Sequence, residues 1–124
     1  MQSYSYIKEL FSLPSKIKHL DNYINNLSRC SYFAIDTESC FNSISYYILE
    51  KKKLIDKFNK LMNCYLNLDK KFIDCVKMKF LYHCTTNEIS DVLDISERTI
   101  LRRLAFVNCK FKSLLNKGEI YGKL

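Results

Sequence analysis

The sequence predicts an all-α protein, and three observations carry that prediction. Apolar residues recur at helical spacing over most of the 124 residues. With 48% hydrophobic residues the chain can build a core without disulfides or a metal. It contains two glycines and one proline, whereas an all-β fold needs turn residues about every 8–12 positions. We therefore expect a folded, helical chain with no sandwich or barrel and no glycine-rich nucleotide loop.

The charge balance points to a polyanion as partner. Twenty Lys and Arg against 13 Asp and Glu give a net charge of +7, which favours nucleic acid first and an anionic membrane second. No apolar run approaches the roughly 20 residues of a membrane span, and the N-terminus does not resemble a signal peptide. The six cysteines contain no C-x-x-C pair, which suits reduced thiols. We expect a cytoplasmic protein without a membrane partner.

The first helix is expected over residues 6–27, where apolar side chains alternate in steps of three and four. Pro14 interrupts this stripe, so we expect a kink or a short break around Ser12–Pro14. Residues 29–43 lose the periodicity and collect Ser, Thr, Asn and Asp, which indicates a connection. The apolar stripe consists of Tyr6, Leu10, Leu13, Ile17, Leu20, Ile24 and Leu27.

The second helix follows this connection and ends near Leu68. Two long amphipathic helices with one connection favour an antiparallel hairpin or an intermolecular coiled coil, although ordinary bundle helices show the same pattern. We assign residues 1–68 to this N-terminal part, for homodimer formation or polymerase contact. Its second stripe consists of Ile44, Tyr47, Ile48, Leu54, Ile55, Phe58, Leu61, Met62, Tyr65 and Leu68.

The sequence pattern of residues 69–124 predicts three shorter helices with clear start signals. Asp69 can cap the first, which we expect to stop near His83 and Cys84. Thr85 and Glu88 have the spacing of a capping box at the start of the second. Ser96 can cap the third, whose buried stripe is expected to end before a stop at Gly118. That stripe consists of Ile100, Leu104, Val107, Phe111 and Leu114 or Leu115.

The last two helices, joined by the short turn at Asp94-Ile95, have the layout of a helix-turn-helix, whose second helix lies in the DNA major groove. Three of the chain's four arginines lie in this second helix, and a guanidinium can bond guanine O6 and N7 together. Between Arg98 and Lys117 there are six basic residues and no acidic one; the rival interpretation is a solvated helix without a partner. The buried contacts between the two helices are expected to be Ile89, Val92, Ile95 and Ile100.

The stretch from Thr86 to Leu104, TNEISDVLDISERTILRRL, resembles the helix-turn-helix of sigma-70 region 4, which reads the −35 promoter element. The likeness covers about residues 68–117, and LuxR-type response regulators share the pattern T-x-x-E-I…I-S-x-x-T-I. Asp94 stands where the family usually has glycine, and Ser90 where it has alanine. We expect both to be accommodated, because Asp tolerates a left-handed backbone.

The short chain is similar to small phage-encoded transcription regulators of the ArpU/RinA kind, which implies binding to double-stranded DNA upstream of a promoter. Two rivals stay open. One is a small terminase subunit that binds DNA for packaging as a ring. The other is a sigma-like domain that binds RNA polymerase or another protein without DNA contact. The three interpretations differ in oligomer size and in salt-dependent DNA binding.

The predicted site divides into two sets of residues. Base edges are expected to be read by Glu97, Arg98, Leu101 and Arg102. Phosphates are expected to bind Thr86, Ser96, Thr99, Arg103, Lys110 and Lys112.

We expect no cofactor, no metal and no enzymatic activity. The histidines, His19 and His83, are not at zinc spacing with each other or with the cysteines. No motif places a Ser or Cys nucleophile beside either of them. Cys75 and Cys84 are instead expected to pack as thiols near a helix end.

Overall fold

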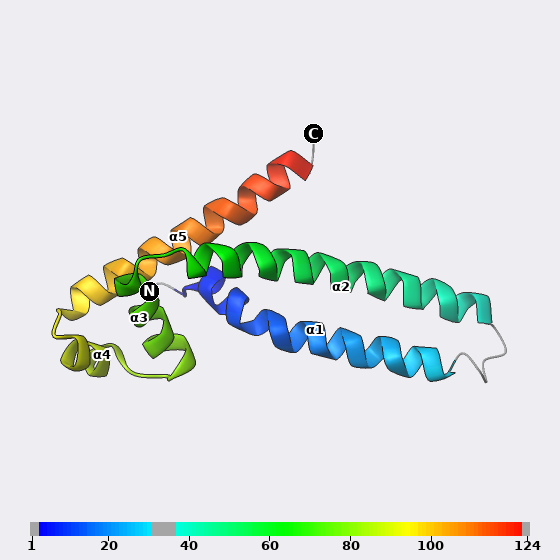
Figure 1. The fold of residues 1–124 in the computed structure, drawn as a ribbon, viewed down its shortest axis with the longest axis horizontal. Coiled ribbons are helices and arrows are strands. Elements are labelled where there is room, and N and C mark those ends of the chain that lie inside the picture. The colour runs from blue at the N-terminus through cyan, green and yellow to red at the C-terminus, as the bar shows by residue number, and fades with distance from the viewer. Residues whose placement is uncertain (1–2, 31–36, 123–124) are drawn as a thin grey trace. The chain divides into compact units, whose positions relative to one another are not determined.

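The structure is a computed structural model that describes residues 3–30 and 37–122, with the backbone alone for residues 37 and 117–122. These residues contain five α-helices and one π-helical segment, and no strand (Figure 1). The predicted all-α class is confirmed. The elements are α1 Ser5–Cys30, α2 Thr37–Leu66, α3 Lys70–Val76, η1 Lys77–Leu81, α4 Thr86–Leu93 and α5 Glu97–Gly122.

The chain divides into two compact units. The first contains Met1–Phe11 together with Lys60–Leu124, and the second contains Ser12–Asn59. The division falls within α1 and within α2, so each of these two helices contributes to both units. The assignment of separate roles to residues 1–68 and 69–124 concerns function and stays a prediction.

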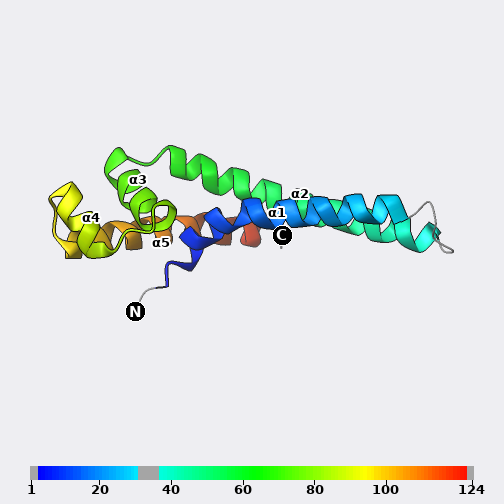
Figure 2. The ribbon, with the colours of Figure 1, turned by 90° about the horizontal axis from the view of Figure 1, so that it is seen from below.

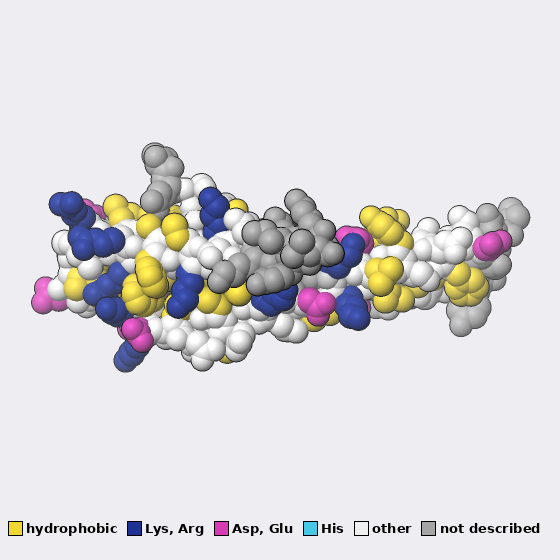
Figure 3. Space-filling view, turned by 90° about the horizontal axis from the view of Figure 1, so that it is seen from above, with side chains coloured by type: hydrophobic (Ala, Val, Ile, Leu, Met, Phe, Trp, Pro, Cys, Tyr) yellow, Lys and Arg dark blue, Asp and Glu magenta, His cyan; other side chains and the backbone are white. Residues whose placement is uncertain are grey.

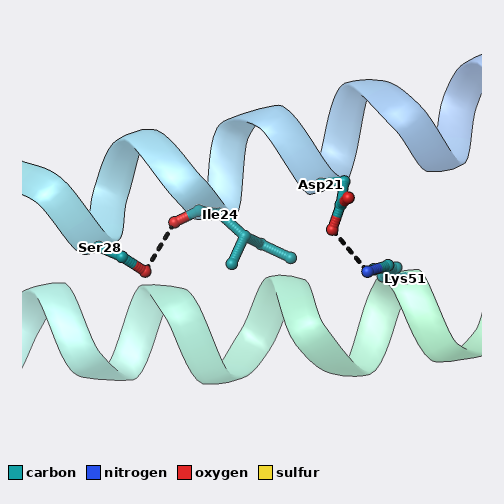
Figure 4. Close-up of polar contacts among 4 residues, drawn as sticks. All are labelled: Asp21, Ile24, Ser28 and Lys51. Atoms are coloured by element: carbon teal, nitrogen blue, oxygen red, sulfur yellow. Dashed lines mark hydrogen bonds and ion pairs between the residues drawn. The ribbon is translucent and has the colours of Figure 1, made fainter.

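In the second unit, α1 and α2 run side by side in opposite directions (Figures 1 and 2). The rings of Tyr23 and Tyr47 meet edge to face with centroids 4.8 Å apart. The Lys51 ammonium forms an ion pair with Asp21, as Figure 4 shows. Apart from Leu13, none of the described side chains of this unit is buried. The unit is therefore a helix pair without a closed core.

The first unit contains nearly all of the buried apolar side chains. They come from the start of α1, the end of α2, and α3, α4 and α5. Burying a side chain of this size stabilises the fold by roughly 1.5–3 kcal/mol. The predicted stripe of α5 is confirmed in its first four positions, which are fully buried, while Leu114 and Leu115 are half-buried. The core consists of Ile7, Leu10, Leu61, Tyr65, Leu68, Cys75, Val76, Ile89, Ile100, Leu104, Val107 and Phe111.

The expectations for α1 and α2 need two corrections. We expected a kink or a short break around Ser12–Pro14, and the helix continues through Pro14, so there is no break. A proline inside a helix costs about 3 kcal/mol, which the burial of Leu10 and Leu13 in the turn before it can offset. The predicted connection is also too long, because α1 reaches Cys30 and α2 begins at Thr37. Residues 31–36 of that connection lie outside the described residues.

The last three helices also differ in detail from the prediction. Asp69 occupies the N-cap position of α3, but its side chain makes no capping hydrogen bond. The segment ends where expected: the Cys84 amide donates to the Met78 carbonyl at 2.8 Å, and His83 takes a positive φ of 55°. The predicted stop at Gly118 is wrong, because α5 runs on to Gly122. Glycine within a helix costs only about 1 kcal/mol relative to alanine.

The first turn of α1 is capped from α5. Asn108 Oδ1 accepts hydrogen bonds from the amides of Tyr6 and Ile7, at 2.9 and 3.2 Å. These amides belong to the first turn of a helix, where no backbone carbonyl is within reach as acceptor. Since residue 108 is about 100 positions away in the sequence, periodicity and local capping rules could not indicate this contact.

Replacing Asn108 tests the importance of this cap. We expect Asn108→Ala to lower the free energy of unfolding by about 1–2 kcal/mol, because two amides lose their acceptor. Asn108→Asp keeps the acceptor oxygen and should stay close to the parent protein. Urea unfolding followed by circular dichroism measures both. Equal stability of the Ala and Asp variants would contradict this role.

Candidate nucleic-acid interface

The start of α4 is fixed by a capping box. The Glu88 amide donates to Thr85 Oγ1 at 3.1 Å, and the Thr85 amide donates to Glu88 Oε1 at 3.3 Å. The prediction from their spacing is confirmed. Each side chain satisfies an amide that the helix itself leaves without an acceptor, so the direction in which α4 begins is set locally.

The turn between α4 and α5 is held by its own hydrogen bonds. Asp94 takes a left-handed backbone, with φ 56° and ψ 46°, as the expected tolerance of Asp for this conformation allows. The amides of Asp94 and Ile95 both donate to the Ser90 carbonyl. Ser90 Oγ in turn donates to the Ile95 carbonyl at 2.6 Å. Ser90 is thus part of the turn and not merely accommodated, which the sequence did not indicate.

The start of α5 is capped as predicted. Ser96 Oγ accepts from the Thr99 amide at 3.1 Å and lies 2.9 Å from the Thr99 hydroxyl. A side-chain oxygen at this position satisfies one of the amides of the first helical turn. Both hydroxyls are thus already engaged within the chain, although each oxygen keeps further bonding capacity.

Burial between α4 and α5 follows the prediction at three of four positions. Ile89 and Ile100 are fully buried and Ile95 is half-buried. The prediction is wrong for Val92, because its side chain is 69% exposed, whereas Leu93 is half-buried. Ile89 and Leu93 form the inner side of this eight-residue helix, and Val92 lies on the other flank of Ile89, at about 60° of rotation from it.

The predicted base-reading residues all lie on exposed positions of α5. Glu97, Arg98, Leu101 and Arg102 are exposed, whereas the stripe beginning at Ile100 is fully buried. With about 100° of rotation per residue, Arg98 and Arg102 fall on the side opposite that stripe.

The predicted phosphate-binding residues are divided by exposure. Ser96, Lys110 and Lys112 are exposed, while Thr86, Thr99 and Arg103 are half-buried. Among the described residues, none of the cations of α5 between positions 98 and 112 forms an ion pair with a carboxylate. The positive charge of this helix is therefore not neutralised within the described structure.

Arg103 is tied to α3. Burial raises the pKa of the Cys75 thiol, and a hydrogen bond from the Arg103 guanidinium to that thiol acts in the opposite direction. On α2, burial raises the pKa of the Cys64 thiol, and the charge of Lys110 acts in the opposite direction. Burial thus favours the protonated form of both thiols.

A groove of about 330 Å³ lies between α3 and α5. The rings of Phe72 and Phe106 stack in it, with centroids 4.7 Å apart and planes 22° apart. Figure 3 shows Lys and Arg side chains around hydrophobic ones on this part of the surface, toward the left of the view. The groove is lined by Lys71, Phe72, Thr99, Arg102, Arg103 and Phe106.

Sequence reasoning missed Lys71, Phe72 and Phe106 as site residues. Phe72 is half-buried, and Phe106 is 49% exposed. A signal was present: Phe106 stands four residues from both Arg102 and Lys110, on the polar side of the helix. An aromatic residue among cations on an exposed helix face is typical of a binding surface more than of a core.

The described residues contain no cluster of three or more His, Cys, Asp or Glu side chains that could hold a metal ion. None of the helices, over the residues that can be described, is both long and apolar enough to cross a membrane. No protein family, curated protein or solved structure matches the chain. The assignment of function therefore depends on the surface of α3, α4 and α5 and on its charge.

The Ser90 hydrogen bond gives a test of the turn. We expect Ser90→Ala to lower the free energy of unfolding by about 1 kcal/mol, because the half-buried Ile95 carbonyl loses its donor. Ser90→Thr retains a hydroxyl and serves as the matched variant. Thermal or urea unfolding compares the two, and a Ser90→Ala protein as stable as the parent would show that the turn does not need this bond.

Proposed function

We propose that the chain is a sequence-specific DNA-binding transcription regulator whose α4 and α5 form a helix-turn-helix of the sigma-70 region 4 kind. The observation that carries the proposal is the exposed side of α5, where Arg98 and Arg102 stand opposite a fully buried stripe and have no carboxylate partner among the described residues. The capped turn before α5 fixes the direction of this helix, which is what insertion into a major groove requires.

The side chains of α5 take different roles in this proposal. Arg98 and Arg102 bond guanine edges, Glu97 accepts from a cytosine amino group, and Leu101 contacts a thymine methyl group. Lys110, Lys112 and the capped helix starts bind phosphates and set the position along the duplex.

The resemblance to phage regulators of the ArpU/RinA kind supports activation of transcription from a site upstream of a promoter, with RNA polymerase as a second partner. A small terminase subunit and a polymerase-binding domain without DNA contact are alternative outcomes of the experiments below. Selection of bound duplexes from a random pool at two salt concentrations separates them. An enriched site supports a regulator, salt-sensitive binding without a site supports packaging, and no binding supports protein docking.

Substitutions on α5 test the division between base and phosphate contacts. We expect Arg98→Ala to reduce the binding free energy at the selected DNA site by about 1–3 kcal/mol and to relax specificity at one base pair. Lys112→Ala removes the same charge, but it should weaken binding to all DNA sequences alike. It should also reduce the slope of log affinity against log salt concentration by about one. Equal effects of both variants across matched and mismatched sites would contradict the assignment.

We further propose that the second unit forms a homodimer contact. Between residues 38 and 49 only Glu38 is charged, although several large apolar side chains there are exposed. In a two-fold contact each patch faces a copy of itself, so a patch almost without charge suits a second copy of the chain. A helix pair without a core also gains the burial that it lacks. The exposed set in this stretch is Phe41, Tyr46, Ile48 and Leu49.

Light scattering on the purified protein tests the dimer. We expect a mass near twice 14.7 kDa, and we expect Ile48→Lys to give a monomer because it places like charges opposite each other in the contact. Asn59→Lys adds the same charge to an exposed position of α2 outside the patch and should leave the mass unchanged. A monomeric parent protein contradicts the proposal, and a ring of eight or more subunits would favour the terminase interpretation.

A further inference from the structure

The groove between α3 and α5 combines two kinds of side chain. Its rim includes Lys71, Arg102 and Arg103, and none of its six lining residues is acidic. Its aromatic part is the stacked pair of Phe72 and Phe106. A ligand that matches both must carry negative charge and a flat apolar surface in close proximity.

The aromatic pair is accessible to a ligand. Phe106 is 49% exposed. The Lys71 ammonium lies over the Phe72 ring at 5.2 Å from its centroid, and the Lys110 ammonium lies over the Phe106 ring at 5.8 Å. Both distances are in the cation–π range. Lysine side chains are flexible, so they can move from a ring to a nearby phosphate when a base takes their place.

The size of the groove favours one nucleotide over a protein segment. Its volume of about 330 Å³ is near the lower end of ligand pockets, which span roughly 300–1,000 Å³. Six lining residues from two helices can surround one ring and its phosphate, whereas a docked peptide helix needs a longer apolar groove.

We propose that this groove binds single-stranded nucleic acid, with one unpaired base stacked on Phe106 and the adjoining phosphates held by Lys71 and Arg103. Cationic grooves with exposed aromatic side chains bind single strands in this way. The inference rests on the proposed function in taking a nucleic acid as partner, but Phe72 and Phe106 have no role in reading the duplex. It gives the protein a contact for a strand that is unpaired beside its duplex site.

The test compares two single strands that differ only in their bases. Fluorescence anisotropy measures binding of the full chain to a labelled oligothymidylate and to an abasic strand of equal length and charge. We expect the oligothymidylate to bind about fivefold more tightly or better, because each stacked base contributes to affinity. Equal affinity for the two strands overturns the proposal.

Two substitutions at Phe106 isolate stacking. Phe106→Leu keeps an apolar side chain without a ring, and we expect it to reduce oligothymidylate binding to the abasic level while abasic binding stays unchanged. Phe106→Tyr keeps the ring and should bind like the parent. Because Phe106 lies outside the buried core, neither change should unfold the chain, and circular dichroism checks this. Equal losses in the Leu and Tyr variants overturn stacking as the cause.

Duplex binding, measured in the same variants, separates this inference from the proposed function. A parent that prefers oligothymidylate over the abasic strand but binds no duplex supports the groove and contradicts the regulator. A parent that selects a duplex site but does not distinguish the two single strands supports the regulator and contradicts the groove. Absence of binding to every nucleic acid contradicts both.

Discussion

The burial of one side of α5 is the constraint on which the first unit depends. Ile100, Leu104, Val107 and Phe111 are fully buried, so they determine which side of the helix remains outside. α3 and α4 both pack on this helix, and Asn108 from the same helix caps the start of α1. The exposure of the arginines is thus a consequence of the core, and a change in the packing of α5 would alter the core and the candidate interface together.

The two units meet the need for burial in different ways. The first unit satisfies it within the chain, since nearly all of the fully buried side chains lie there. In the second unit the edge-to-face pair of Tyr23 and Tyr47 and the ion pair of Lys51 with Asp21 hold two helices together, but a partly exposed ion pair contributes little, with a median of about 0–1 kcal/mol. Most helical stability in proteins comes from packing an apolar face. A unit of two helices with exposed apolar side chains therefore has a physical reason to associate.

Local signals in the sequence predicted the helical elements well. The features that were not predicted depend on contacts between residues far apart in the sequence. The capping box at Thr85 and the cap at Ser96 depend on residues three positions apart, and both appear in the structure. No break occurs at Pro14, because the local penalty of the proline is offset by the burial of Leu10 and Leu13 before it. The Asn108 cap and the stacking of Phe72 on Phe106 join residues from different helices, which periodicity within one helix cannot indicate. The exposed arginines were found because amphipathic spacing alone places them.

The charge on α5 is costly to the helix that carries it. Arg98 lies in the first turn, where the helix dipole disfavours a cation. Arg102 follows four residues later, and like charges at this spacing destabilise a helix by roughly 0.2–0.5 kcal/mol. Within the described residues neither one forms an ion pair with a carboxylate, although Glu97 in the same first turn is favoured by the helix dipole. Arginine is itself a good helix former, so the cost comes from the placement of the two charges and not from the residue type. In the proposed function a bound polyanion neutralises both charges at once, while the capped turn before α5 and the aromatic pair beside Arg102 are the features on which the proposed duplex site and the adjoining single strand rest.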